Sequence, residues 1–273
     1  MKVLVTGHKG FIGQNLVKYI REHTDWEVKG WEWGDSVFPT VDGNDWVIHL
    51  GAMSSTTEQN VDKILERNLE FSQKLYTACQ RLYVNLQYAS SASVYGLESD
   101  FKESTKVNPV TPYAWSKYLF DRWVHQQNHS FNCLVQGFRY FNVYGHGESH
   151  KIGQASPIST FTQQAKETGK IKLFHGSDAY LRDFIAVEDI CRLHLEFIKH
   201  KVSGVWNLGT GKPTSFESVA VAIRNRYGGI LEYINMPDNL RAGYQKYTCA
   251  DITKLEDTLG PQKFITVEDW LNS

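Results

Sequence analysis

The 273-residue sequence has few cysteines, and they lie far apart. Cys79, Cys133, Cys191 and Cys249 form no CxxC pair and no cluster with histidine, so neither a zinc site nor a disulfide framework is expected. An excess of charge is also missing, since 29 basic residues face 30 acidic ones. A near-neutral chain has no electrostatic footprint for nucleic acid or an anionic membrane, and we expect neither as a partner.

Long apolar stretches are absent too. No window approaches the roughly 20 apolar residues that cross a bilayer, and the apolar run after Met1 is too short for a secretory signal. We therefore expect a soluble, cytoplasmic protein. With 41% hydrophobic and 13% aromatic residues, and no repeat or low-complexity tract, the composition is that of a globular protein with a large core.

Apolar strand-like runs alternate with amphipathic helical stretches through the first half of the chain. Strands are predicted at Val3–Val5, Glu27–Trp33, Trp46–Leu50, Leu86–Ala89 and Cys133–Tyr140, and helices at Asn15–Arg21, Asp62–Arg81 and Pro112–Gln127. This alternation predicts an α/β fold with a Rossmann-type, doubly wound parallel sheet.

After Tyr144 the pattern changes to shorter elements. Helices are predicted near 158–168, 187–200 and 216–227, strands near 172–174, 205–208 and 231–234, and two further helices near the C-terminus. We predict that residues 1–143 and about 185–208 form a dinucleotide-binding domain. Residues of about 144–184 and 209–273 are then a smaller C-terminal substrate-binding lobe over the carboxyl ends of the sheet.

Three glycines, Gly7, Gly10 and Gly13, follow the first predicted strand and open the first helix. Glycines at this spacing allow a tight turn, close approach of the backbone to a pyrophosphate and close strand–helix packing. A glycine-rich turn without a ligand is the alternative, and the place at the first strand–helix junction favours a dinucleotide. Glu32 ends the second strand, where a carboxylate binds a ribose 2′-hydroxyl and disfavours a 2′-phosphate. An exposed glutamate is the alternative there.

Tyr113 and Lys117 are four residues apart in a predicted helix, so their side chains share one face. An ammonium group beside a phenol favours its ionisation, which suits proton removal from an alcohol. The alternative is that both side chains are part of a solvent-exposed helix face, where this spacing is common. The serine cluster Ser90–Ser93 at a predicted strand end and the glycine loop favour the chemical interpretation.

Further segments resemble the extended short-chain dehydrogenase/reductase superfamily of NAD-dependent epimerases and dehydratases. They are His49–Ala52, Ser90–Gly96, Phe138–Gly145, Arg182–Phe184 and Asn207–Gly211, so the resemblance covers nearly the whole chain. More specific segments resemble the ADP-glycero-manno-heptose 6-epimerases of lipopolysaccharide biosynthesis: Ser54–Glu58, Gly147–Gly153, Lys172–Ser177 and Ala242–Gln245.

This resemblance implies a nucleotide-sugar epimerase that interconverts ADP-D-glycero- and ADP-L-glycero-manno-heptose. The reaction passes through a transient ketone at C6″ and uses tightly bound NAD or NADP. Tyr113, with its pKa lowered by Lys117 and the nicotinamide, takes the hydroxyl proton while Ser91 holds the same oxygen. Lys151 matches the second acid/base, for which a solvated loop lysine is the alternative.

The resemblance also implies the binding residues. The cofactor set is Gly7, Gly10, Phe11, Ile12, Gly13, Glu32, Leu50, Gly51, Ala52, Asn68, Tyr113 and Lys117. The substrate set is Ser54, Ser93, Asn142, His150, Phe174, Arg182 and Tyr244. The planar fork of Arg182 suits a diphosphate, with an ion pair to Asp183 as the alternative. Phe174 either lines the nucleotide pocket or fills the core. No metal is expected, and the family suggests a homo-oligomer of unspecified size.

One departure from the family lies between Trp33 and Asp45, which are too close in sequence for the usual helix and strand. A shortened loop there opens the adenine side of the cofactor pocket and leaves NAD or NADP undecided. Trp31 and Trp33 either pack on adenine or fill the core. A 4,6-dehydratase lacks its Asp-Glu pair here, because Ala92-Ser93 stands in that place. A UDP-hexose 4-epimerase and a redox-silent NAD(P)-binding scaffold stay open.

Overall fold

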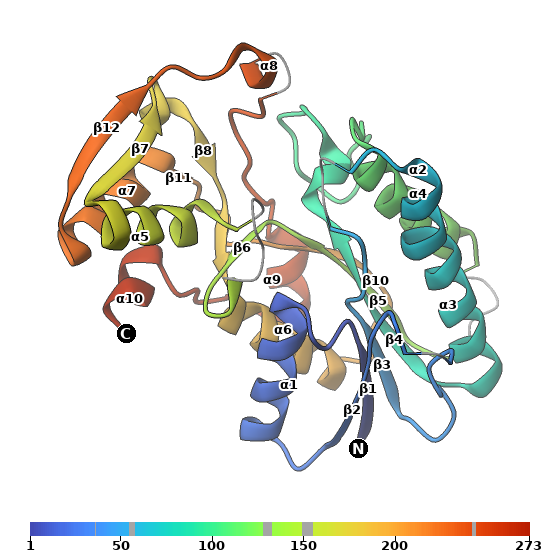
Figure 1. Cartoon of the computed structure of the whole chain (residues 1–273). Coiled ribbons are helices and arrows are strands. Elements are labelled where there is room, and N and C mark those ends of the chain that lie inside the picture. Colours follow the sequence, from blue (N-terminus) through green and yellow to red (C-terminus); the bar gives the residue numbers. More distant parts are fainter. Residues whose placement is uncertain (36, 55–57, 128–132, 149–154, 242–243) are drawn as a thin grey trace.

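A six-stranded, all-parallel sheet runs through the centre of the molecule (Figure 1). The computed structural model describes the whole chain except residues 36, 55–57, 128–132, 149–154 and 242–243. In spatial order the strands are β10 (Gly204–Leu208), β5 (Val135–Tyr140), β4 (Asn85–Ser91), β3 (Trp46–His49), β1 (Lys2–Thr6) and β2 (Glu27–Trp31). The predicted parallel sheet is confirmed.

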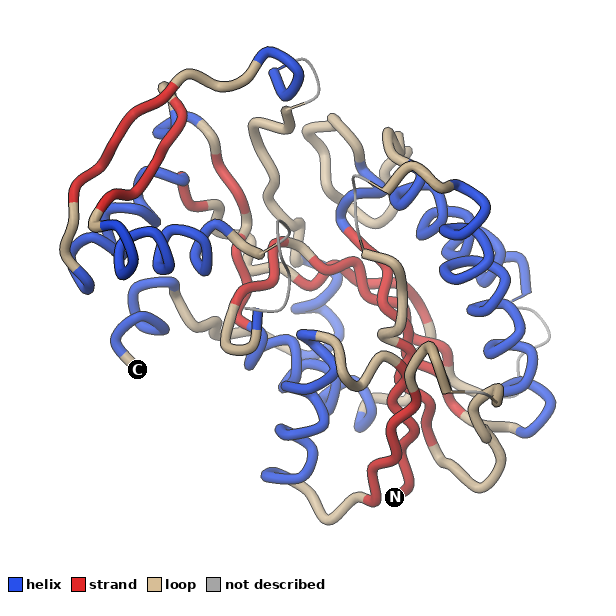
Figure 2. The backbone as a smooth tube through the Cα atoms, in the orientation of Figure 1, coloured by secondary structure: helices blue, strands red, loops and turns tan. Residues whose placement is uncertain are grey.

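Helices cover both faces of this sheet, as the tube in Figure 2 shows. Helices α1 (Phe11–His23) and α6 (Val187–Lys199) pack on one face, and α3 (Phe71–Leu82) and α4 (Pro112–Gln127) pack on the other. Side chains of β1 alternate between these layers, because successive strand residues point to opposite faces. Val3 and Val5 join the core beneath α1 and α6, whereas Leu4 joins the core beneath α3 and α4.

A second group of elements surrounds a core of its own, at the upper left of Figure 1. Its helices are α5 (Pro157–Thr168), α7 (Phe216–Tyr227) and α10 (Val267–Asn272), and its strand pairs are β7 (Lys170–Phe174) with β12 (Ile230–Ile234), and β8 (Leu181–Arg182) with β11 (Thr214–Ser215). The pair β6 (Asn142–Tyr144) and β9 (Phe184–Ala186) follows β5 and precedes α6. Short helices α8 (Asp238–Arg241) and α9 (Thr253–Leu259) complete the chain.

The helix predicted from Asp62 to Arg81 is not continuous. It consists of α2 (Val61–Leu65), a π-helical turn (Glu66–Glu70) and α3. A π-helical turn adds a residue to the helical repeat, which amphipathic periodicity does not reveal, and such turns concentrate at functional sites. The described residues between Trp31 and Trp46 form no strand or helix beyond an isolated bridge, in agreement with the predicted loop.

The order of the strands creates a switch point at β1. The chain leaves β1 for β2 on one side and returns to β3 on the other, so the loops after β1 and β3 diverge above the sheet. Ligands of open α/β sheets bind at this point, outside the carboxyl ends of the strands. In the described part of the chain, no helix is long and apolar enough to cross a membrane.

Candidate active site

The glycine loop lies at this switch point and packs against the loop after β3. Gly7 has a φ of +74°, and a Cβ added there would lie 2.5 Å from the Gly51 nitrogen. A Cβ on Gly13 would lie 2.1 Å from the Gly7 oxygen. Gly10 caps α1 without a side-chain hydrogen bond, so the positive end of the helix dipole faces this loop. The loop therefore suits a pyrophosphate.

The carboxylate of Glu32 lies beside the glycine loop. Its Oε2 accepts a hydrogen bond from the Lys9 amide at 3.2 Å, and its Oε1 accepts one from the Trp33 amide at 3.2 Å. This is the position that the sequence predicted for contact with a ribose. The carboxylate also places negative charge where a 2′-phosphate would sit.

The shortened loop after β2 is packed down by aromatic rings. Trp31 is buried, stacks on Phe71 with ring centroids 4.9 Å apart, and donates from its Nε1 to the Val37 carbonyl at 2.8 Å. Trp33 contacts the same phenylalanine, and the guanidinium of Arg67 lies 4.9 Å from the Trp33 ring centroid. Of the two interpretations of Trp31, core packing is therefore the one that holds.

The three predicted catalytic residues that the structure describes lie together. Ser91 is the last residue of β4, and Tyr113 and Lys117 stand one turn apart at the start of α4. The Lys117 Nζ donates to the Ala89 carbonyl at 2.8 Å and lies 5.9 Å from the centroid of the Tyr113 ring. The side chain of Ser91 lies beside the Tyr113 phenol. Ser93 is bonded to the same serine, with 2.9 Å between the two Oγ atoms.

Burial sets the protonation of this group. It lowers the pKa of Lys117 to about 8, against the opposing charge of Asp121. Burial also raises the pKa of Tyr113, and the hydrogen bond with Ser91 opposes this rise. The prediction that Lys117 lowers the pKa of Tyr113 is thus not met by the protein's own groups. The Lys117 ammonium is bonded to the Ala89 carbonyl, and desolvation of the phenol dominates.

Asn68 in the π-helical turn ties the loop after β3 to α4. Its Oδ1 accepts from the Met53 amide at 2.8 Å, and its Nδ2 donates to the Met53 carbonyl at 3.0 Å and to the Ser116 Oγ at 3.1 Å. Ser116 in turn donates to the Tyr113 carbonyl at 2.7 Å. The side chain thus positions the first turn of α4, and its direct contact with a cofactor stays a prediction.

A cavity lies in the C-terminal group of elements. It has a volume of about 320 Å³, and aromatic side chains among its lining residues are Phe174, Tyr180, Phe216 and Tyr244. Phe174 and Tyr244 were predicted to contact substrate, and the structure brings them to one cavity. The size and the apolar rings suit a nucleotide base.

Arg182 stands at the edge of this aromatic group. Its guanidinium lies 5.4 Å from the Phe216 ring centroid and 5.5 Å from that of Tyr244, and it donates to the carbonyls of Leu181 and Gln245. The side chain is buried, and burial lowers its pKa. No carboxylate within ion-pair distance of Arg182 occurs among the described residues. A buried cation without an anion suits a phosphate group.

The alternative ion pair between Arg182 and Asp183 is wrong. Asp183 is fully buried and accepts from the Thr210 amide (2.8 Å), the Thr210 hydroxyl (2.7 Å), the Gly211 amide (2.9 Å) and the Ala250 amide (2.9 Å). Neighbouring residues of extended backbone point to opposite sides, so these two side chains diverge. Through these hydrogen bonds, Asp183 holds the loop after β10 and the loop before α9 together.

The remaining predicted residues fall into three groups. Lys151 and His150 lie outside the described residues. Asn142 donates its amide to the Asp183 carbonyl at 3.0 Å, and Ser54 is exposed. The residues beside the glycine and β3 loops are buried or half-buried: Phe11, Ile12, Leu50, Gly51 and Ala52. For Phe11 and Ile12, which pack in the sheet core, only backbone contact with a cofactor is compatible with this placement.

The sequence matches the NAD dependent epimerase/dehydratase family over residues 3–209. The chain belongs to this family. It is 38% identical to an ADP-L-glycero-D-manno-heptose-6-epimerase of Alkalilimnicola ehrlichii, over 93% of this chain and 90% of that protein. The crystal structure of an ADP-L-glycero-D-manno-heptose-6-epimerase of Helicobacter pylori matches with a TM-score of 0.86 and 25% identity, over 99% of this chain and 94% of that one.

The fold is also shared with solved structures of lower sequence identity. A Thermus thermophilus UDP-glucose 4-epimerase in complex with NAD has a TM-score of 0.81 and 24% identity, over 100% of this chain and 98% of that one. The family is NAD-dependent, and the tight glycine loop at the start of α1 fits a dinucleotide. Within the family, the predicted nucleotide-sugar epimerase is confirmed at the level of enzyme class.

Two positioning residues of this epimerase were missed by sequence reasoning. Glu148 is buried, and it accepts from the Gly145 amide at 2.9 Å and from the Ser156 amide at 2.5 Å. It thereby joins the two sides of the segment that contains Lys151. His49 bridges Thr6 and Ser72 beneath the switch point, and burial lowers its pKa to about 3. His49 carries no local signal because it acts through Thr6 and Ser72, which are distant in sequence. Glu148 acts through the nearby Gly145 and Ser156, but an acidic residue in a glycine-rich loop forms no recognisable motif.

Proposed function

We propose that this protein interconverts ADP-D-glycero- and ADP-L-glycero-manno-heptose by oxidation and reduction at C6″. The observation that carries the proposal is the 38% identity, over 93% of the chain, with a heptose 6-epimerase. The substrate-side loops that resemble these epimerases support the same choice. A UDP-hexose 4-epimerase is the second candidate, since the sheet and the Ser91, Tyr113 and Lys117 group serve both reactions.

The bound dinucleotide supplies the acceptor of the hydride and later its donor. Tyr113 removes the proton from the C6″ hydroxyl as its phenolate, and Ser91 donates a hydrogen bond to the same oxygen. Both can act on one atom because β4 and α4 bring the two side chains together. Lys117 stays protonated near neutral pH, since its pKa is about 8, and its charge near the phenol favours the phenolate when proton transfer begins. The product of this step is a ketone.

Epimerisation requires the ketone to present its other face before hydride returns. A proton must then reach the oxygen from a second group, and Lys151 is the residue that the resemblance assigns to this role. Glu148 and Ser156 hold the ends of the segment that carries it. Tyr113 and Lys151 would therefore divide the acid/base work between the two faces of the sugar.

The nucleotide would lie in the C-terminal cavity. Phe174 and Tyr244 would pack against the base, and Arg182 would bind the diphosphate between the base and the sugar. Asn142 and Ser93 would then face the sugar from the side of the sheet. This assignment follows the predicted division into a dinucleotide-binding domain and a substrate-binding lobe.

Glu32 supports NAD as the cofactor in preference to NADP. Its carboxylate is fixed by the amides of Lys9 and Trp33 and would repel a 2′-phosphate. Mass spectrometry of the dinucleotide that co-purifies with the protein decides this point, and NADP would contradict it. The homo-oligomeric state and the cytoplasmic location stay predictions.

The decisive experiment offers the purified protein ADP-D-glycero-manno-heptose and, separately, UDP-glucose, with product stereochemistry read by NMR. We expect conversion of the first alone. Tyr113→Phe should lower the rate by about 10²–10⁴-fold, the usual contribution of a general acid/base. Tyr118→Phe, on the same helix, is the matched control and should leave the rate unchanged. Conversion of UDP-glucose alone would establish the 4-epimerase instead.

Lys151→Met tests the second acid/base. We expect slow epimerisation with unchanged cofactor content, because oxidation on the Tyr113 face does not use this lysine. Lys166→Met, an exposed change on α5, is the control. Loss of the bound cofactor in Lys151→Met would show a structural role and refute the assignment.

A further inference from the structure

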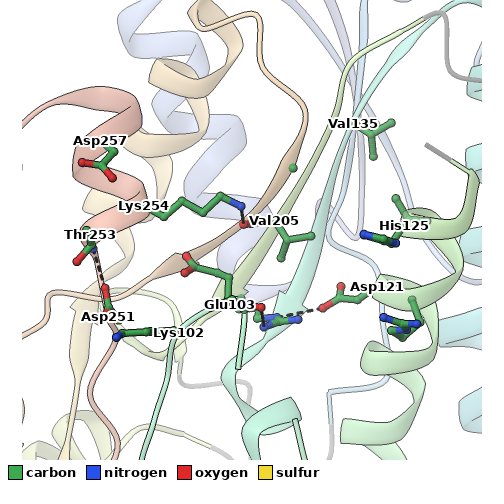
Figure 3. Close-up of a pocket in the computed structure, with 15 residues that line it drawn as sticks. Lys102, Glu103, Asp121, His125, Val135, Val205, Asp251, Thr253, Lys254 and Asp257 are labelled. Carbon is green, nitrogen blue, oxygen red and sulfur yellow. Dashed lines mark hydrogen bonds and ion pairs between the residues drawn. The ribbon is translucent and has the colours of Figure 1, made fainter. Parts of the chain in front are cut away.

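A buried ion pair lies behind the predicted catalytic residues. Asp121 on α4 and Arg139 on β5 are joined at 3.1 Å, and their side chains are 4% and 7% exposed. Both residues line a cavity of about 800 Å³ between α4 and α9, and Ser91, Tyr113 and Lys117 do not line it. Figure 3 shows Asp121 among the residues that line this cavity, with a dashed line that marks the interaction of its carboxylate.

The same carboxylate connects α4 to the end of β4. Its Oδ2 accepts from the Ser90 Oγ at 3.0 Å, and Ser90 directly precedes Ser91. One turn earlier on the same helix face, Lys117 donates to the Ala89 carbonyl at 2.8 Å. Two consecutive residues of β4 are therefore bonded to two consecutive turns of α4. These two bonds set the separation of Ser91, which β4 carries, from Tyr113, which α4 carries.

Stability alone does not account for charges at this place. Apolar side chains of similar volume are often as stable as a buried ion pair, or more so, because both ions must be desolvated. The Ser90 hydroxyl and the Ala89 carbonyl could also join β4 to α4 through hydrogen bonds to uncharged side chains. The carboxylate has a further effect, since its negative charge opposes the burial that lowers the pKa of Lys117.

We propose that Asp121 is a positioning residue that, with Ser90 and Arg139, fixes Ser91 against Tyr113 and keeps Lys117 charged. This inference rests on the proposed function, in which a charged Lys117 assists proton transfer at Tyr113. Arg139 limits the effect, because its positive charge offsets part of the field of Asp121. The pair thus acts on the charge of the lysine from the next turn of α4, on the same helix face.

The other ionisable groups around Lys117 do not change charge near the pKa of Lys117. His49 on β3 faces it and is neutral above a pKa of about 3, and Tyr113 on its own helix has a raised pKa. Asp121 is faced by Arg139 on β5 and by Tyr88 on β4, whose pKa is raised well above its ordinary value. The loss of charge on Lys117 near pH 8 is therefore expected to produce the alkaline decline in rate.

The test measures the pKa of Lys117 directly and the pH profile of kcat. Protein carrying ¹⁵N-labelled lysine is titrated by NMR, with Lys117→Arg to assign the signal. Asp121→Asn should move the pKa and the alkaline decline down by about one pH unit, as expected for loss of a nearby opposite charge. Arg139→Gln should move both up, because Asp121 then acts without its partner.

Two further variants separate position from charge. Ser90→Ala removes the hydrogen bond between Ser90 and Asp121 but keeps the charge of the Asp121 carboxylate. The value of kcat should therefore fall severalfold, with KM and the alkaline decline in rate unchanged. Asp257→Asn removes another carboxylate of the same cavity and should change nothing.

Equal loss of kcat at every pH in Asp121→Asn, with the Lys117 pKa unmoved, would overturn the inference. If Asp121→Asn does not fold, two other results would overturn the inference. These are a downward shift of the Lys117 pKa in Arg139→Gln, or an unchanged kcat in Ser90→Ala. If the wild-type protein shows no epimerase activity, the proposed function fails. The NMR titration would still decide the charge effect on its own.

Discussion

Arg182→Gln separates substrate binding from stability, because the guanidinium is buried without a carboxylate partner. Removing one member of a buried ion pair costs about 3–5 kcal/mol, since the other charge is left unpaired. Among the described residues, the partners of Arg182 are two backbone carbonyls and two aromatic rings. Glutamine can still donate to a carbonyl, so we expect the free energy of unfolding to change by no more than about 1 kcal/mol, and Tm by about 2–4 °C.

Ligand binding should respond far more strongly. A hydrogen bond to a charged group contributes about 1.5–3 kcal/mol, and a diphosphate accepts two from one guanidinium. Loss of about 3 kcal/mol raises Kd by roughly two orders of magnitude. Calorimetric titration with ADP and with UDP should show this weakening for both, because the diphosphate and not the base is affected. Affinity for AMP should fall much less.

Arg226→Gln, an exposed change at the end of α7, is the matched control for charge. Arg139→Gln is the contrasting case, because it leaves the Asp121 carboxylate buried and unpaired and should lower Tm clearly. A drop in Tm of Arg182→Gln as large as that of Arg139→Gln, with unchanged ADP affinity, would refute the reasoning and make Arg182 a structural tie.

Three further predictions concern the cofactor loop, the loop anchor and acid stability. Gly13→Ala should abolish dinucleotide binding, measured by the absorbance of co-purified cofactor, because its Cβ would meet the Gly7 oxygen at 2.1 Å. Asp183→Ala should cost about 3–5 kcal/mol in urea unfolding, since it leaves buried donors unpaired. Burial lowers the pKa of His49 and of His194 from 6.5 to about 3, so the unfolded chain binds more protons between these values. Stability is then present above pH 6.5 and is lost as pH falls toward 3, by up to about 1.4 kcal/mol per pH unit for each histidine. His194→Gln should flatten this slope in melting curves.

Local patterns predicted much of this protein. The alternation of strand and helix was sufficient for the parallel sheet, because buried strands and amphipathic helices have different periods. The glycine spacing placed the cofactor loop, since few residues besides glycine fit a φ of +74° and a backbone contact with Gly51. The Tyr113–Lys117 spacing placed both side chains on one helix face, where the structure has them.

Contacts between distant segments decided the rest. The π-helical turn that directs Asn68 toward Met53 and Ser116 has no signature in the periodic pattern. The ion pair between Arg182 and Asp183, which the sequence left as the alternative to a phosphate contact, does not form, because extended backbone turns neighbouring side chains apart. Sequence order suggested a contact that strand geometry forbids.

The chain by itself determined the family and the sheet and indicated the candidate catalytic residues, because each depends on local spacing and on residue type. Only the tertiary structure decided the pKa values and ion-pair partners of these side chains. The low pKa of Lys117, the high pKa of Tyr113 and the unpaired cation of Arg182 arise from burial, which depends on elements distant in sequence. Desolvation acts on a side chain through everything packed around it, and no local pattern of residues contains that information.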